Sequence, residues 1–197
     1  AKELNVKRVI YSSTSSGYGA NPIPNDEEQP DDCLNPYSVS KIAGEKLCIM
    51  YTKLFNLNTI IFRYFNVFGE RSPTKGQYTP VTSTFLKQKN NGDPLTIIGD
   101  GEQSRDFIYV KDVANINVIA AKSYLPKEKF GQIYNVGSGY KLSINQIANF
   151  ISSNQVHLPP RIGEVRFSVA NINKTKSTFN WQPKVSLEEW LCTKIKE

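Results

Sequence analysis

The order of apolar and polar segments in the first third of the chain constrains its fold more than any other feature. A short apolar run at residues 6–11 precedes a polar, proline-rich stretch at residues 21–34, and a second apolar run lies at residues 57–63. Runs of this length bounded by turn residues are typical of buried strands. Residues 36–56 between them have helical periodicity, and strand, helix and strand in this order predict a parallel sheet.

The predicted helix has a well-defined beginning. The side chain of Asn35 is suited to capping the first turn, and Pro36 fits the first helical position, where no backbone donor is needed. Tyr37 and Lys41 lie one turn apart on the helix surface. Roughly opposite them, five apolar residues form one stripe that we expect to cover the core: Val39, Ala43, Leu47, Met50 and Leu54.

Tyr37 and Lys41 are candidates for acid–base chemistry. An ammonium beside a phenol favours the phenolate, which makes a tyrosine usable as a general base or acid near neutral pH. The alternative is a chance spacing, because the chain has 10 tyrosines and 24 lysine and arginine residues. The surroundings of the pair therefore decide its meaning.

Polar residues follow both predicted strands of this unit. Residues 12–19 are rich in hydroxyl groups, and residues 63–69 include Arg63, Tyr64 and Asn66. In open α/β sheets, ligands bind at the carboxyl ends of the strands. We therefore expect a ligand site there, the alternative for residues 12–19 being an ordinary serine and glycine turn.

The rest of the chain alternates further strands and helices. Strands are predicted at residues 94–98, 104–110 and 133–136, and helices at residues 81–91, 113–121, 144–151, 174–179 and 187–195. Asp112 and Ser143 are predicted helix caps, and Ser186 with Glu189 is predicted to form a capping box.

Composition narrows the class of protein. The chain is 39% hydrophobic and 21% charged, as in globular domains, and no run approaches the ~18 apolar residues of a membrane span. The net charge of +6 suits an anionic ligand, but the lysines form no basic tract, so no nucleic-acid partner is expected. Cys33, Cys48 and Cys192 are far apart and odd in number, which favours a reducing, cytoplasmic compartment. With His157 as the only histidine, no metal site is expected.

Six short motifs are weak signals individually, but their order along the chain is informative. They lie at residues 7–14 with 18–19, at Pro36-Tyr37 with Lys41, and at residues 63–69, 99–107, 134–137 and 160–164. In this order they resemble the extended short-chain dehydrogenase/reductase family, in particular its nucleotide-sugar epimerases and dehydratases. The likeness is greatest to the UDP-sugar 4-epimerases, and it covers nearly the whole chain.

The resemblance implies an α/β fold, namely the carboxyl-terminal part of a Rossmann-like doubly wound parallel sheet plus a smaller mixed α/β substrate domain. Residues 1–67 would be the remainder of an NAD-binding domain. Residues 68–197 would be mainly a nucleotide-sugar-binding domain, with a segment around residues 104–125 returning to the first. The implied activity is NAD-dependent inversion of the sugar 4-hydroxyl through a transient 4-keto intermediate, of the UDP-glucose/UDP-galactose type.

The resemblance also implies roles for individual residues. Tyr37 would be the acid–base residue, Lys41 would favour its phenolate, and Thr14 would bond the sugar hydroxyl. Contacts with NAD are implied for Tyr37, Lys41, Tyr64, Ser12 and Ser13. Contacts with the UDP-sugar are implied for Thr14, Asn66, Arg105, Arg161 and Glu164. The alternatives are a surface ion pair between Arg105 and Asp106 and a solvated Arg161.

Two departures from the family pattern bear on the activity. Dehydratases and decarboxylases of the family carry carboxylates just after the threonine, where this chain has Ser15 and Ser16, and this difference favours epimerisation over dehydration or reduction. The glycine-rich phosphate-binding turn is not present, and about 100 residues of the family's cofactor-binding half are expected to precede a chain of this kind. The alternative of another class is an inactive nucleotide-sugar-binding fragment.

Family members commonly pair through helices, and one of these corresponds to the Tyr37 helix. Ile42 and Ile49 lie beside the predicted stripe and widen its apolar band beyond what a one-sided surface helix needs. We therefore expect a homodimer through this helix, the alternative being that the band packs within one subunit.

Overall fold

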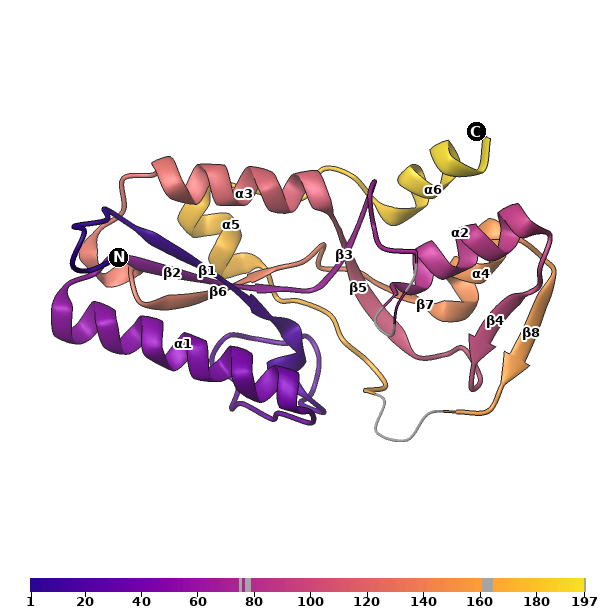
Figure 1. Cartoon of the computed structure of the whole chain (residues 1–197), viewed down its shortest axis with the longest axis horizontal. Helices are drawn as coiled ribbons and strands as arrows, with labels where there is room; N and C mark the ends of the chain where they lie inside the picture. The colour runs from indigo at the N-terminus through magenta and orange to yellow at the C-terminus, as the bar shows by residue number, and fades with distance from the viewer. Residues whose placement is uncertain (75, 77–78, 161–164, 197) are drawn as a thin grey trace.

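The computed structural model describes residues 1–74, 76, 79–160 and 165–196, and its shape is elongated (Figure 1). The strands are β1 (Val9–Thr14), β2 (Thr59–Tyr64), β3 (Asn66–Phe68), β4 (Leu95–Ile98), β5 (Ser104–Tyr109), β6 (Gln132–Val136), β7 (Lys141–Ser143) and β8 (Gln155–Leu158). The helices are α1 (Pro36–Phe55), α2 (Val81–Asn91), α3 (Val110–Lys122), α4 (Ile144–Ile151), α5 (Asn173–Phe179) and α6 (Leu187–Lys196). Short 3-10 turns lie at Ser15–Tyr18 and Lys127–Lys129.

The predicted strand–helix–strand unit is present. Strands β1, β2 and β6 form a parallel sheet in that order, and the register places Thr14 of β1 beside Tyr64 of β2. Helix α1 covers one face of this sheet, while α3 and α5 lie on the other (Figure 1). The carboxyl ends of β1 and β2 therefore meet at the same edge, near the beginning of α1.

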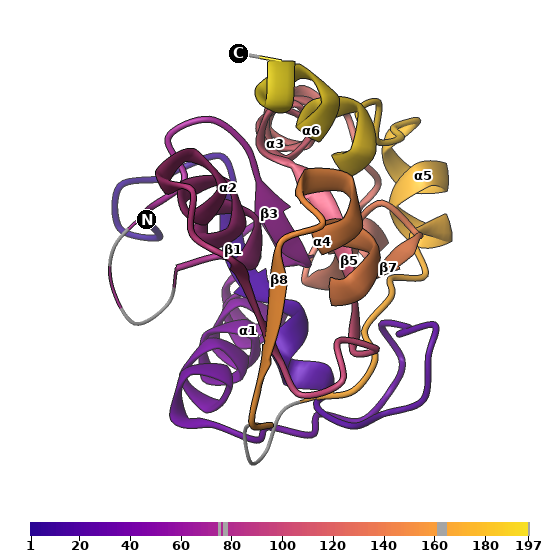
Figure 2. The same ribbon diagram turned by 90° about the vertical axis from the view of Figure 1, so that its right-hand side faces the viewer.

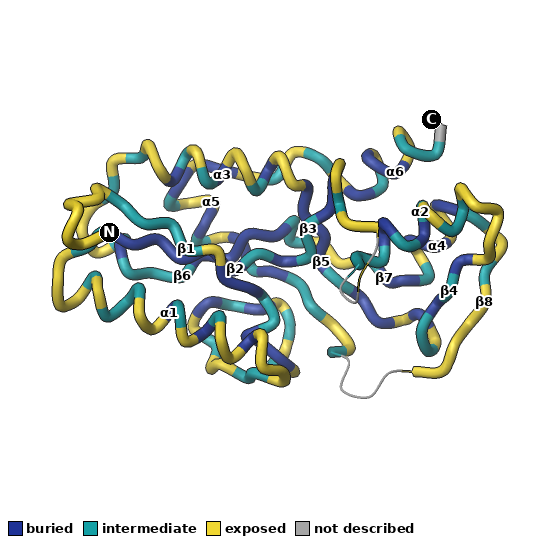
Figure 3. The backbone as a smooth tube through the Cα atoms, in the orientation of Figure 1, coloured by how far each residue is buried: buried dark blue, intermediate teal, exposed yellow. Residues whose placement is uncertain are grey.

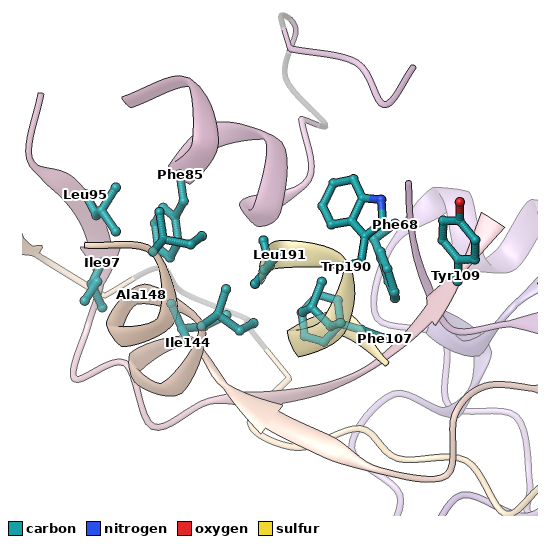
Figure 4. Close-up of a cluster of buried hydrophobic side chains, with 13 residues drawn as sticks. Phe68, Phe85, Leu95, Ile97, Phe107, Tyr109, Ile144, Ala148, Trp190 and Leu191 are labelled. Atoms are coloured by element: carbon teal, nitrogen blue, oxygen red, sulfur yellow. The ribbon is translucent and has the colours of Figure 1, made fainter. Parts of the chain in front are cut away.

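Strand β5 faces two separate hydrophobic cores. Ile108 packs in the core of the parallel sheet with α3 and α5, whereas Phe107 and Tyr109 pack in a second core. This second core also includes Phe85 of α2 and Trp190 of α6 (Figure 4). Successive side chains of a strand point to opposite faces, so one strand serves both cores.

The second core lies at the far end of the molecule. There, β4 pairs in parallel with β8, and α2 and α4 contact each other and β4 (Figure 2). The buried segments of Figure 3 run from the parallel sheet through β5 into this end. No helix in the described ranges has the length and apolar character needed to cross a membrane.

Most predicted elements are confirmed, including the cap at Ser143 and the capping box of Ser186 with Glu189. Ser143 and Gln146 cap α4 reciprocally, and so do Ser186 and Glu189 at the beginning of α6. Strand β8 is not predicted, because the polar–apolar alternation of its sequence extends over four residues only and these are mostly exposed. The first strand is shifted, since residues 2–5 form a turn and β1 begins only at Val9.

The predicted cap of α3 is wrong. The helix begins at Val110, and Asp112 lies inside its first turn. The Asp112 carboxylate is buried and accepts hydrogen bonds from the backbone N–H groups of Lys184 (2.8 Å) and Val185 (3.2 Å). Asp112 therefore binds backbone N–H groups of a segment about 70 positions away. Nothing in the sequence around Asp112 indicates such a contact.

The predicted inner face of α1 is also wrong. Val39, Leu47 and Leu54 of the apolar stripe are 55%, 57% and 67% exposed. The buried residues of this helix are instead Ser38, Ile42 and Glu45, about a third of a turn beyond Tyr37 and Lys41. Hydrophobic periodicity selects the wrong face here because two of the three buried residues are polar.

Candidate active site

Tyr37 and Lys41 stand where α1 approaches the carboxyl end of β1. Asn35 caps the helix, because its Oδ1 accepts from the backbone N–H of Ser38 at 2.8 Å, and this fixes the first turn that carries Tyr37. The Lys41 ammonium donates to the Ser12 carbonyl at 2.9 Å and lies 6.0 Å from the ring centre of Tyr37. Tyr37 is 52% exposed, so its phenol is accessible to a ligand.

Thr14 and Tyr64 end the two neighbouring strands. Thr14 is 7% exposed, and its hydroxyl accepts from the Ser16 backbone N–H and donates to the Ser16 hydroxyl, both at 3.2 Å. Tyr64 is half-buried, and its hydroxyl bonds the side-chain amide of Asn117 on α3. The register therefore brings Thr14 and Tyr64 together, beside the first turn of α1.

Ser12 and Ser13 differ in their surroundings. Ser12 is exposed, and its carbonyl holds the Lys41 ammonium. Ser13 is 4% exposed, and its hydroxyl donates to the carboxylate of Glu45. Cofactor contact at these two serines stays a prediction.

Asn66 and Arg105 line two adjoining cavities. The first, of about 220 Å³, is also lined by Ser15, Ser16 and Ser168. The second, of about 280 Å³, extends to the beginning of α2. Because both cavities share Asn66 and Arg105, they form one cleft that leads away from the carboxyl end of β1.

The guanidinium of Arg105 is anchored by backbone carbonyls. Its Nη1 donates to the carbonyls of Ser104 (3.0 Å) and Arg166 (3.3 Å), and Asn66 Nδ2 donates to the Asp106 carbonyl (2.9 Å). A surface ion pair between Arg105 and Asp106 is excluded, because Asp106 is fully buried. Arg161 and Glu164 lie outside the described residues, so their roles stay predictions.

Asp106 is a residue whose importance the sequence does not reveal. Its carboxylate accepts from the backbone N–H groups of Ser138 (2.6 Å), Gly139 (2.9 Å) and Ala170 (3.0 Å). Burial raises the pKa of Asp106, and these hydrogen bonds oppose the rise. The carboxylate holds two loops beside Arg105. In the sequence, its position next to Arg105 is the one feature that could have pointed to this role.

A cavity larger than these two lies away from these residues. It has a volume of about 540 Å³ and lies between residues 1–3, α1 and the beginnings of β1 and β2. Its lining is mainly apolar and lacks the converging polar groups of the Asn66–Arg105 cleft. Size alone is therefore a poor guide to the site in this chain.

Comparisons with known proteins find relatives along nearly the whole chain. The chain is 33% identical over 196 residues to a putative UDP-glucose 4-epimerase of Methanocaldococcus jannaschii, covering 95% of this chain and 62% of the relative. The structure of UDP-N-acetylglucosamine 4-epimerase from Methanobrevibacter ruminantium M1, in complex with UDP-N-acetylmuramic acid, superposes with a TM-score of 0.91 at 34% identity, covering 99% of this chain and 64% of that one.

A third protein supplies a structure with a cofactor. UDP-glucuronic acid 4-epimerase from Bacillus cereus, in complex with UDP-glucuronic acid and NAD, superposes with a TM-score of 0.88 at 31% identity, covering 99% of this chain and 62% of that one. The chain thus spans less than two thirds of the length of each of these proteins. Residues 1–137 match the NAD dependent epimerase/dehydratase family, and the chain belongs to this family.

Proposed function

We propose that the protein carrying this chain is an NAD-dependent 4-epimerase of a UDP-sugar, of the UDP-glucose/UDP-galactose type. The observation that carries the proposal is the contact of Lys41, one turn from Tyr37, with the Ser12 carbonyl near the end of β1. The cleft lined by Asn66 and Arg105 begins at Ser15, directly after Thr14. Acid–base residues and donors suited to a diphosphate then belong to one continuous site.

The residues present fit the nicotinamide end of NAD. Tyr37 is exposed on α1, and the Lys41 ammonium lies on the Ser12 carbonyl near the end of β1. Tyr64 ends the neighbouring strand, and its hydroxyl bonds Asn117 of α3. The sequence has no glycine-rich turn of the G-x-G-x-x-G kind to hold the cofactor diphosphate. The proposal for NAD therefore concerns these three side chains and the nicotinamide end of the cofactor alone.

The proposed reaction requires a proton to leave the sugar 4-hydroxyl and later return. Tyr37 takes this proton as its phenolate, and the resulting phenol gives it back. Thr14 would orient the hydroxyl, and Arg105 with Asn66 would hold the diphosphate while the sugar turns. When bound, NAD supplies the hydride acceptor and donor.

Ser15 and Ser16 favour epimerisation over elimination. Both line the first cavity, and neither can act as the carboxylic acid or carboxylate that removal of a 5-hydrogen and a 6-hydroxyl would need. A 4,6-dehydratase or a reductase is therefore the second candidate, and an inactive nucleotide-sugar-binding fragment is the candidate of another class.

Turnover separates these candidates. Protein expressed from the complete reading frame is incubated with NAD and UDP-glucose, and the sugars are then analysed. UDP-galactose is the expected product, whereas a 4-keto-6-deoxy sugar would replace the epimerase with a dehydratase. Tyr37→Phe should lower kcat by roughly 10²–10⁴-fold, because the proton carrier is lost. Tyr51→Phe, on the same helix, is the matched control and should leave kcat unchanged.

A further inference from the structure

Two opposite charges are fully buried between α1 and β2. Arg63 and Glu45 have side chains that are 1% and 0% exposed. The Nε and Nη2 atoms of Arg63 donate to the Glu45 carboxylate at 2.8 and 2.7 Å, so the pair is bidentate. Neither residue reaches the cleft, and the mechanism above uses neither.

The pair belongs to a larger group that we call the Glu45–Arg63 cluster. Ser13 of β1 donates its hydroxyl to Glu45, and Arg63 Nη2 also donates to Asp31 at 2.6 Å. The guanidinium carbon of Arg63 lies 4.6 Å from the ring centre of Tyr18. The cluster thus consists of Ser13, Tyr18, Asp31, Glu45 and Arg63, and it joins α1 to β1, β2 and the loop before the helix.

Helix α1 has little apolar contact with the sheet. Ile42 is its only buried apolar residue. Gly44 allows a close approach to β1, since a Cβ there would clash with the Tyr11 hydroxyl. Directional contacts near its beginning and middle are those of the Lys41 ammonium on the Ser12 carbonyl and of Glu45 on Ser13 and Arg63. Farther along, Thr52 and the Cys48 carbonyl bond the Thr59 hydroxyl of β2.

Directional contacts fix a position more sharply than apolar ones do. A buried ion pair contributes little net stability compared with well-packed apolar residues of the same volume, since desolvation offsets the attraction. Its geometry is restrictive, however, because a bidentate pair tolerates little rotation or sliding. Glu45 lies one turn from Lys41 and two turns from Tyr37, while its partner Ser13 precedes Thr14 directly.

We infer that the Glu45–Arg63 cluster is a positioning device that sets the rotation and height of α1 on β1 and β2. It thereby places Tyr37 and Lys41 relative to Thr14. This inference rests on the proposed function, because it assigns the cluster a role in bringing the acid–base pair to the sugar. Glu45 and Arg63 act through Tyr37 and touch neither sugar nor cofactor. A merely stabilising role is the rival explanation.

Apolar replacement of the pair separates these roles. Glu45→Met with Arg63→Leu removes both charges and keeps most of the volume. In protein from the complete reading frame, we expect the double variant to denature at about the wild-type midpoint, with kcat at least tenfold lower and KM for the UDP-sugar within twofold. A double variant with both the denaturation midpoint and the kcat of wild type would overturn the inference. Lys46→Gln, which removes only the exposed partner of Asp31, is the control and should match wild type.

A second variant tests the inference if the double variant does not fold. Arg63→Lys keeps the charge but cannot make the bidentate contact, so kcat should fall at least threefold with KM unchanged. A wild-type kcat in this variant would also overturn the inference.

The role of the cluster can be tested even if the proposed function is wrong. If wild type shows no turnover with any UDP-sugar, amide hydrogen exchange of residues 38–48 is compared between Glu45→Gln and Lys46→Gln. Positioning predicts faster exchange in these amides alone for Glu45→Gln. Exchange that rises uniformly across the chain, or does not rise at all, would contradict it.

Discussion

The residues of the candidate site fall into two groups according to how visible they are in the sequence. The positions of Tyr37 and Lys41 on α1 are predictable, because cap and helical spacing are local signals, whereas the role of Thr14 is implied by the family resemblance alone. Asn135, behind the cleft residues Tyr18 and Asn25, is not predictable. It is fully buried, accepts from the Tyr18 hydroxyl at 2.7 Å and donates to the carbonyl of Asn25 at 3.0 Å. Its partners lie more than 100 positions away, so only the fold reveals the contact.

Arg105 provides the sharpest test of the substrate cleft. Charge-assisted hydrogen bonds from arginine to a diphosphate are worth ~1.5–3 kcal/mol. Arg105→Ala should therefore weaken UDP binding by roughly ten- to a hundredfold, measured by calorimetric titration. Arg166→Ala removes an exposed arginine paired with Asp100 at 2.7 Å and should leave the affinity unchanged. Equal dissociation constants for wild type and Arg105→Ala would remove Arg105 from the site.

Asp31 should make stability depend on pH at the acidic end. Burial opposes ionisation, but hydrogen bonds from Lys46 and Arg63 outweigh it and hold the pKa of Asp31 below its ordinary 3.8. Because the folded value is the lower one, the stabilisation is present above pH 3.8 and is lost as pH falls through the folded pKa.

Denaturation of wild type and Asp31→Asn at two pH values tests this. At pH 7 the substitution should lower the free energy of unfolding by about 1 kcal/mol, a value kept small because Asp31 is partly exposed. As pH falls through the folded pKa of Asp31, the difference between the two proteins should shrink, since a protonated aspartate is as neutral as the asparagine that replaces it. A difference that grows on acidification would contradict the assignment, and exposed Glu128→Gln is the control at both pH values.

At the scale of single elements, helix limits are easier to predict than helix faces. The beginning of α1 follows from Asn35 and Pro36, which are local signals. The orientation of α1 depends on the ion pair of Glu45 with Arg63, which lies 18 positions away on β2. Hydrophobic periodicity cannot predict this orientation, because it assigns apolar residues to the buried face. The proposed domain limits at residues 67 and 68 remain a prediction.

The cap of α1 should contribute to stability and to the placement of Tyr37. Asn35→Ala removes the acceptor for the Ser38 backbone N–H, and losses of this kind cost ~0.5–2 kcal/mol. Chemical denaturation should show a decrease within this range. Asn35→Ser retains a capping oxygen and should recover most of it, so an equal loss in both variants would mean that Asn35 acts in another way.

At the scale of the whole molecule, we propose that the exposed stripe of α1 is the interface of a homodimer. Val39, Leu47 and Leu54 lie in a row on the surface, and apolar rows of this kind mark interfaces. Light scattering of protein from the complete reading frame at micromolar concentration should give the mass of two subunits.

Leu47→Glu should shift this mass toward one subunit, because a charge in the centre of the stripe would be desolvated on pairing. Val118→Glu makes a similar change at a half-exposed valine of α3 and should leave the dimer intact. A wild-type mass of one subunit would defeat the prediction directly.

Strand β5 has a consequence for how the molecule melts. It carries Arg105 near one end, supplies side chains to both cores and continues into α3 without a loop. Neither core can lose its order without disturbing this shared segment, so heat should unfold both in a single cooperative transition. A ligand that binds Arg105 would then raise the melting temperature of the distant parallel sheet as much as that of the region around Arg105.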